Sequence, residues 1–331
     1  MDENEYGLAA ARLPAAPDPA KAKKEFSRLG FALLLFLTLG TALQLGAGWL
    51  LQRPDMPQSP LLRWGLGYIA PLYLIGVPAA LLVMRGVPAE KAAPRPLPGG
   101  SILVYLLMCF PIMYGGNLVG TMLSVMFSGG SAENPLLNVA MDSSWIQIVV
   151  LAVLAPLFEE FIFRKQLIDR IGRYGEKTAI FFSALTFGLF HGNLYQFFYA
   201  FGLGALFAWI YTRTRRLRWS AILHMCVNFL GSVVAPWILQ HTDLDVVEDL
   251  AAGSMDVDLK DIALLEIYGL CMLGLSIAGL VLLIRRRKRF VLEPTAEQLP
   301  RGTGFRVSCL NPGVLLFALV CAGVFVYVLI A

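Results

Sequence analysis

The chain has 331 residues, of which 57% are hydrophobic and 15% are charged, and its formal net charge is +4 at pH 7. Soluble domains contain about 45–50% apolar and about 25% charged residues, so this composition excludes an aqueous globular enzyme, a disordered chain, a collagen and a small disulfide scaffold. The excess of apolar side chains predicts a protein that exposes much of its surface to lipid.

The predicted elements are helices that cross a bilayer. Residues 1–27 are polar, lack the regions of a cleaved signal peptide, and are expected to form a flexible cytoplasmic tail. A spanning helix needs roughly 20 mostly apolar residues, and no stretch alternates as a strand does. We therefore expect an all-α fold, a polytopic transmembrane helical bundle of about nine spans. The predicted spans are 29–51, 61–84, 101–127, 145–163, 178–193, 196–212, 218–239, 262–284 and 312–331.

Lysine and arginine gather in alternate loops of this bundle. They precede the first span and follow the second, fourth, sixth and eighth, whereas residues 128–144 contain neither and residues 241–261 are acidic. Because cytoplasmic loops carry the excess positive charge, we expect the N-terminus in the cytoplasm and the C-terminus outside. Each basic cluster adjoins a span and lacks interleaved aromatic residues. We therefore expect the protein to contact a lipid bilayer and to bind no nucleic acid.

The chain is expected to divide into four parts. After the tail, residues 28–285 form a transmembrane bundle whose motif-bearing core lies near 100–240. Residues 286–311 form a polar cytoplasmic connector, and residues 312–331 form an additional C-terminal transmembrane helix.

Two adjacent carboxylates lie inside the fourth predicted span. Charged residues at such positions are costly and are usually functional. Glu160 and Arg164 are four residues apart on one helix face, so they are expected to form a supporting ion pair. Glu159 is rotated from Glu160 by about 100° and lacks that partner, which makes it the better candidate for a general base.

Two of the 3 histidines, His191 and His224, also fall inside predicted spans. Glu159 and His191 are similarly distant from the hairpin between their spans, so we expect them to reach similar depths. His224 and Asn228 share one helix face, and both side chains offer N–H donors. His224 lies about 9 Å inside the cytoplasmic boundary, so three spans are predicted to bring polar groups to one level.

These residues form three ordered motifs that resemble those of the CPBP family. That family comprises the CAAX-type intramembrane endopeptidases and bacterial relatives linked to bacteriocin processing and self-immunity. The resemblance covers about residues 100–240. The motifs read Glu159-Glu160-x-x-x-Arg164, Phe187-x-x-x-His191 and His224-x-x-x-Asn228.

The resemblance implies proteolysis within the membrane. Glu159 and His191 would activate a water, and His224 and Asn228 would stabilise the oxyanion. The substrate would be a protein or peptide, including one anchored in the membrane, cleaved near the cytoplasmic face. The expected location is the bacterial inner (plasma) membrane.

A metal ion is the alternative to a metal-free mechanism. Glu159, His191 and His224 could bind zinc with water as the fourth ligand. The H-E-x-x-H spacing of common zinc proteases is absent, so we expect no metal and no other cofactor.

Two other functions remain open from the sequence. Intramembrane glutamate and histidine could relay protons in a proton-coupled transporter, although no internal repeat is evident. A non-catalytic membrane scaffold or immunity protein could retain the same fold. A serine or cysteine nucleophile is less attractive, because Ser183 and Ser220 have no evident base partner and Cys226 points away from His224.

Overall fold

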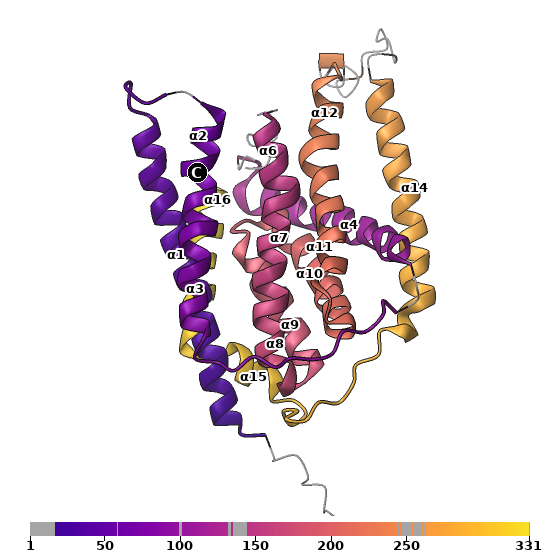
Figure 1. The fold of residues 1–331 in the computed structure, drawn as a ribbon. Helices are drawn as coiled ribbons and strands as arrows, with labels where there is room; N and C mark the ends of the chain where they lie inside the picture. Colours follow the sequence, from indigo (N-terminus) through magenta and orange to yellow (C-terminus); the bar gives the residue numbers. More distant parts are fainter. Residues whose placement is uncertain are drawn as a thin grey trace, which may run out of the picture.

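The computed structural model describes residues 17–330, apart from 58, 99–100, 132–133, 135–143, 244, 247–252, 254–259 and 261. Helices make up nearly all of the secondary structure in these residues, and no strand occurs among them (Figure 1). The expected all-α polytopic bundle is confirmed. The loops 128–144 and 241–261, on which part of the orientation prediction depends, fall largely outside the described residues.

Eight helical rods in the described chain are long and apolar enough to cross a membrane. Several of them are α-helices interrupted by π-helical turns. The first three are α1 (Pro19–Leu51), the rod of α2 (Pro60–Trp64), η1 (Gly65–Gly76) and α3 (Val77–Met84), and α4 (Ile102–Ser128). The fourth comprises α6 (Trp145–Val149), η2 (Val150–Leu154), α7 (Ala155–Glu160), η3 (Phe161–Gln166), α8 (Leu167–Ile171) and the 3-10 turn η4 (Gly172–Tyr174).

The remaining rods follow a short helix, α9 (Glu176–Phe190). They are α10 (Leu194–Thr214); α11 (Leu217–Phe229), η5 (Leu230–Val234) and α12 (Ala235–Gln240); α14 (Ala263–Arg286) with η6 (Arg287–Arg289); and α16 (Pro312–Ile330). A short helix, α15 (Gly304–Cys309), precedes α16.

The fifth predicted span, 178–193, is the one that falls short of a full crossing. Helix α9 has 15 residues and rises by about 22 Å, less than the roughly 30 Å of a bilayer core. It ends in a tight turn in which Gly192 adopts a φ of 70°, and α10 begins at Leu194. The α9–α10 hairpin therefore turns at the depth of His191, within the bundle rather than at its surface.

Helix α1 begins within the segment that was expected to be a flexible tail. The Asp18 side chain accepts hydrogen bonds from the backbone nitrogens of Ala20 and Lys21, and Pro19 occupies the first helical turn. Both features favour helix initiation. The tail prediction therefore fails for residues 19–27, while residues 1–16 lie outside the described chain.

Proline explains several of the π-helical turns. Pro71 lies inside η1, and η2 and η5 directly precede turns that contain Pro156 and Pro236. Proline lacks the backbone N–H and crowds the carbonyl four residues earlier, so the preceding turn widens. Segment η3, which follows Glu160, contains no proline.

Small residues bring α4 and α10 together at the centre of the bundle. Helix α10 packs against both α4 and α9. A β-carbon at Gly116 or Gly120 of α4 would overlap the backbone of α10 at Tyr199 or Leu194. Such close backbone approach is the usual function of small residues in membrane helix pairs.

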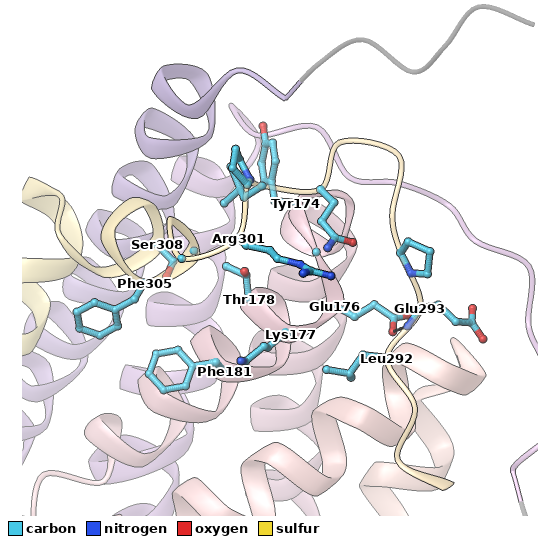
Figure 2. A pocket seen from close by; sticks show the side chains of 17 residues that line it. Tyr174, Glu176, Lys177, Thr178, Phe181, Leu292, Glu293, Arg301, Phe305 and Ser308 are labelled. Atoms are coloured by element: carbon cyan, nitrogen blue, oxygen red, sulfur yellow. Dashed lines mark hydrogen bonds between the residues drawn. The ribbon is translucent and has the colours of Figure 1, made fainter. Parts of the chain in front are cut away.

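One end of the bundle carries the basic loops, and we call it the basic end. Figure 1 shows α15 and the extended connector from α14 at this end, at the bottom of the view. Helix α1 starts there, whereas α16 runs from there towards the opposite end. The connector covers a cavity of about 800 Å³ beside the start of α9, lined in part by Glu176, Arg301 and Phe305 (Figure 2).

Candidate active site

Glu160 lies at the centre of a fully buried ion pair. Helix α7 ends at Glu160, and Arg164 follows one turn later, so Arg164 Nη2 lies 3.1 Å from Glu160 Oε1. Neither side chain is exposed, at 0% for each. Arg164 Nη1 also donates a 3.0 Å hydrogen bond to Ser183 Oγ of α9, and Ser183 donates to the Phe163 carbonyl at 2.7 Å. Because a buried charge is tolerated only when it is paired, this arrangement fixes both groups.

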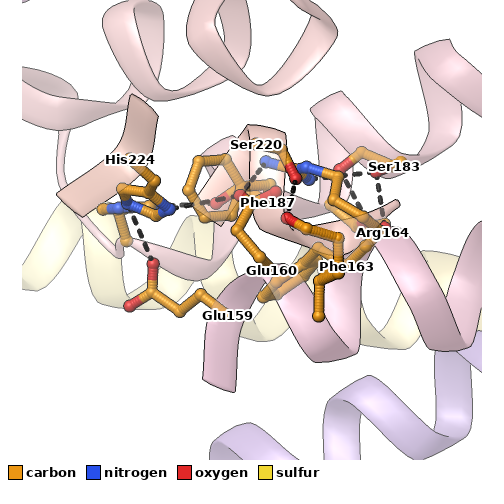
Figure 3. A network of polar contacts seen from close by, with 11 residues as sticks. Glu159, Glu160, Phe163, Arg164, Ser183, Phe187, Ser220 and His224 are labelled. Carbon is orange, nitrogen blue, oxygen red and sulfur yellow. Dashed lines mark hydrogen bonds and ion pairs between the residues drawn. The ribbon is translucent and has the colours of Figure 1, made fainter. Parts of the chain in front are cut away.

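His224 of α11 lies between the two adjacent carboxylates (Figure 3). Its Nδ1 is 3.1 Å from Glu160 Oε1, and its Nε2 is 3.6 Å from Glu159 Oε2. Its side chain is only 6% exposed, against 18% for Glu159. Arg164, Glu160, His224 and Glu159 thus form a row of polar contacts. Glu159 is the more exposed of the two ends of this row.

The charges of this cluster balance only if one proton is shared. Two ionised carboxylates face one arginine, so one negative charge remains unless His224 is protonated or Glu159 holds the proton. His224 and Glu159, whose closest atoms are 3.6 Å apart, are therefore the two groups of this cluster on which that proton can reside.

His191 occupies the turn between α9 and α10. Its Nδ1 lies 2.8 Å from the carbonyl oxygen of Phe187. A carbonyl only accepts hydrogen bonds, so Nδ1 carries the hydrogen and Nε2 of the neutral ring bears the lone pair. This tautomer makes Nε2 a hydrogen-bond acceptor or base.

The phenyl ring of Phe187 joins the three motifs. Its centroid lies 4.8 Å from the His191 ring and 5.6 Å from the His224 ring, both edge-to-face. Arg164 Cζ lies 4.5 Å from the same centroid. The structure thus brings Arg164 and both histidines around one aromatic ring.

Asn228 lies one turn beyond His224 on α11. Its Nδ2 donates a 2.9 Å hydrogen bond to the carbonyl of Leu151 in η2. Widening at a π-turn leaves carbonyls available to side chains from neighbouring helices. Asn228 therefore ties α11 to the rod that carries Glu159, and its amide nitrogen retains a second hydrogen.

The two serine hydroxyl groups that the sequence analysis considered as nucleophiles form hydrogen bonds to backbone carbonyls. Ser183 is fully buried between Arg164 and the Phe163 carbonyl. Ser220 lies beside Glu160 and donates to the Leu217 carbonyl at 3.2 Å (Figure 3). The hydrogen bond from Arg164 to Ser183 holds the arginine in position, a role for Ser183 that the sequence did not indicate.

The alternative of zinc bound by Glu159, His191 and His224 can be compared with this geometry. Both ring nitrogens of His224 face carboxylate oxygens, and Nδ1 of His191 faces a carbonyl. Across the described residues, no group of three His, Cys, Asp or Glu side chains has the arrangement of a metal site. The two Nδ1 contacts leave Nε2 of each ring towards the site, which is also the orientation of zinc-binding histidines, so the metal-free mechanism stays a prediction.

Sequence reasoning also missed an aromatic wall beside Glu159. The Tyr73 ring of η1 stacks on Phe158 with centroids 4.2 Å apart and an interplanar angle of 5°. Tyr68 packs edge-to-face on Tyr73 at 5.8 Å. Nothing in the sequence distinguishes these tyrosines from other aromatic residues in the spans. The cavity in Figure 2 is separate, since its lining includes none of the predicted site residues.

The fold and this centre define a polytopic membrane protein with a buried carboxylate–histidine site. Residues 141–230 match the family model described as type II CAAX prenyl endopeptidase Rce1-like. That segment contains all three motifs. The comparisons therefore confirm the resemblance to the CPBP family of membrane proteases for the helices that carry the site.

Two curated relatives each match just under half of the chain. YdiL of Bacillus subtilis (strain 168), whose description as a membrane peptidase is provisional, is 30% identical over 157 residues, which is 45% of this chain and 63% of the relative. The membrane-embedded CAAX protease MroQ of Staphylococcus aureus (strain USA300) is 25% identical over 170 residues, 47% of this chain and 68% of the relative. The match thus spans about two thirds of each relative. No solved structure matches the chain significantly.

Proposed function

We propose that this protein is an intramembrane endopeptidase that hydrolyses peptide bonds with a water activated by Glu159 and His191. The observation that carries the proposal is the position of His224 between Glu159 and the Arg164-paired Glu160. A structural ion pair needs only Glu160 and Arg164. The additional carboxylate and imidazole provide a proton acceptor and a donor at the same place.

The chemical step uses the two sides of this centre. A water held by the Glu159 carboxylate and Nε2 of His191 loses one proton to Glu159 as its oxygen bonds to the scissile carbonyl carbon. The carbonyl electron pair moves to oxygen, which becomes the oxyanion. When the intermediate collapses, the C–N bond breaks and the proton on Glu159 passes to the leaving amine nitrogen.

His224 and Asn228 are the proposed oxyanion donors. They lie one turn apart on α11, and a His224 ring that carries both hydrogens would donate through Nδ1 to Glu160 and through Nε2 to the oxyanion. A preorganised donor in a dry site contributes about 3–4 kcal/mol to transition-state stabilisation. Asn228 would contribute the second hydrogen of its amide while the first holds the Leu151 carbonyl.

We propose that cleavage occurs near the basic end, which by the positive-inside rule would face the cytoplasm of a bacterial inner membrane. His224 follows the first residue of α11, Leu217, by about 10 Å of helix. A protein or peptide with a segment in or near the membrane reaches this depth. The proposal includes no requirement for a prenyl group on the substrate.

The decisive experiment is peptidase activity of the full chain reconstituted in lipid, with proteome-derived peptides as substrates and products read by mass spectrometry. Glu159→Gln preserves size and is expected to lower kcat about 10³-fold, as loss of a general base does. Glu266→Gln, an exposed carboxylate on α14, is the matched control and should leave activity unchanged.

Four outcomes would decide against the proposal. Full cleavage by Glu159→Gln would remove the proposed base. Loss of activity on chelation, restored by stoichiometric zinc, would replace the metal-free mechanism. Normal biological function of a Glu159→Gln strain would favour a scaffold or immunity role, and proton-driven solute flux in the same vesicles would favour a transporter.

A further inference from the structure

A second surface feature lies at the basic end, away from the site. A groove of about 960 Å³ opens where α1, α3 and the first turn of α16 meet. Its lining combines the cations Lys23, Lys24 and Arg28 with the apolar side chains of Phe31 and Leu82.

The three cations have few partners of their own. Lys23 and Lys24 are exposed and form no ion pair or hydrogen bond with any residue that the structure describes. Arg28 Nε donates a 2.8 Å hydrogen bond to the Val83 carbonyl at the end of α3, and its guanidinium lies over Gly86, where a β-carbon would overlap it. Arg28 is thus held across the groove, with its positive charge at the surface.

The one acid in the lining is already neutralised. Glu25 forms an ion pair with Arg173, and Tyr174 donates a 2.7 Å hydrogen bond to the same Glu25 oxygen. The groove therefore presents three positive charges with no competing carboxylate among its described lining residues.

The apolar side of the groove faces outward from the bundle. Phe31 is 41% exposed and Leu82 is 61% exposed, although both lie on helices long and apolar enough to span a membrane. On α1 the three cations lie nearer the start of the helix than Phe31 does, and Leu82 lies near the end of α3. A phospholipid has the same order of groups, with a charged phosphate above an acyl chain.

We propose that this groove binds one anionic glycerophospholipid, with its phosphate on Lys23, Lys24 and Arg28 and an acyl chain along Phe31 and Leu82. Charge complementarity selects an anionic over a zwitterionic lipid, since basic pockets between helix ends at the cytoplasmic face bind acidic headgroups. The combination of cations and exposed apolar wall selects a lipid over free phosphate.

The lipid would join helices that are distant in the sequence. Helices α1 and α16 already cross closely at Gly30 and Gly313, and the Gly313 nitrogen donates a 3.0 Å hydrogen bond to Ser27 Oγ. The headgroup contacts α1, while Leu82 and Pro312 bring α3 and α16 to the same groove. Binding there stabilises the contact of the C-terminal helix with the N-terminal one.

The test measures lipid binding by the full-length protein in neutral detergent. Dioleoyl phosphatidylglycerol is titrated, with adduct formation followed by native mass spectrometry and unfolding by a thermal shift. Wild type should bind phosphatidylglycerol and shift upward, and Lys23→Gln/Lys24→Gln should weaken binding about thirty-fold. Both lysines are exposed, so this variant is expected to fold normally.

The matched control removes two cations from another helix end, with Arg287→Gln/Lys288→Gln at η6, and should bind like wild type. The proposal would be overturned if dioleoyl phosphatidylcholine bound as tightly as phosphatidylglycerol, or if both double variants lost lipid binding equally. An equal thermal shift with glycerol phosphate would assign the cations to a free anion instead. Leu82→Gln should weaken lipid binding without changing any response to glycerol phosphate. Unchanged lipid binding by this variant would contradict the proposed acyl-chain contact.

Discussion

Two groups of charged residues in this molecule contain similar side chains but differ in their surroundings. The first is the buried centre of Glu159, Glu160, Arg164 and His224. The second, which we call the connector network, links the basic end of the bundle to the segment after α14. In the network Arg213 forms ion pairs with Glu176 of α9 and Glu293 of the connector.

The two groups differ in access to water. Glu293 is 51% exposed and can remain charged without a full set of partners, whereas Glu160 and Arg164 are 0% exposed. In the buried centre the surplus carboxylate must find a proton or a cation within the protein. Burial therefore ties the charge of Glu159 to that of His224, whereas water as well as Arg213 stabilises the charge of Glu293.

The largest effect on stability is expected from breaking the buried pair. Arg164→Leu leaves Glu160 without its guanidinium and should lower the free energy of unfolding by about 3–5 kcal/mol. The measurement is the unfolding midpoint in mixed micelles. Glu160→Met/Arg164→Leu is the control, because removing both charges should recover much of the loss. Equal destabilisation of the single and double variants would show that the pairing does not matter.

A smaller effect is expected at the edge of the same centre. Asn228→Ala removes a proposed oxyanion donor and the bond to Leu151, and should lower kcat about 10²-fold while changing the free energy of unfolding by about 1 kcal/mol. Ser232→Ala is the matched control, since its hydroxyl donates only to the Asn228 carbonyl one turn away. Comparable losses of kcat in both variants would make Asn228 a packing residue.

The smallest effect is expected in the connector network. Glu293→Gln removes a half-exposed partner of Arg213 and should change the free energy of unfolding by less than about 1 kcal/mol, with the difference vanishing at high salt. Thermal unfolding at two salt concentrations measures it. A loss of unfolding free energy as large as that of Arg164→Leu would mean that the connector network is as inaccessible to water as the buried centre. That result would contradict the proposed difference between the two groups.

Local spacing predicted part of the site. Glu160 and Arg164 are one turn apart, and the structure places them in contact at 3.1 Å. The turn that separates α9 from α10 lies at His191 and Gly192, next to the predicted boundary between the fifth and sixth spans. Span length was harder to predict, because apolar residues continue through a turn as readily as through a helix. For that reason residues 178–193 were predicted to cross the bilayer, although α9 ends at Phe190.

Long-range contacts were beyond the sequence. The spacing placed His224 and Asn228 on one face of α11, but it did not reveal that His224 contacts both glutamates or that Asn228 reaches Leu151. The Tyr73 wall beside Phe158 was equally hidden. Each of these contacts joins residues from different helices, and a helical repeat does not encode the neighbouring helix.

The sequence by itself determined that this chain forms membrane helices, which residues in them are charged, and which of those residues share a turn. These follow from composition and from the fixed rise and rotation of the α-helix. Only the tertiary structure decided that α11 delivers His224 between Glu159 and Glu160, from 64 residues away in the case of Glu160. Helix packing, which depends on side-chain shape along the whole interface, sets that meeting point.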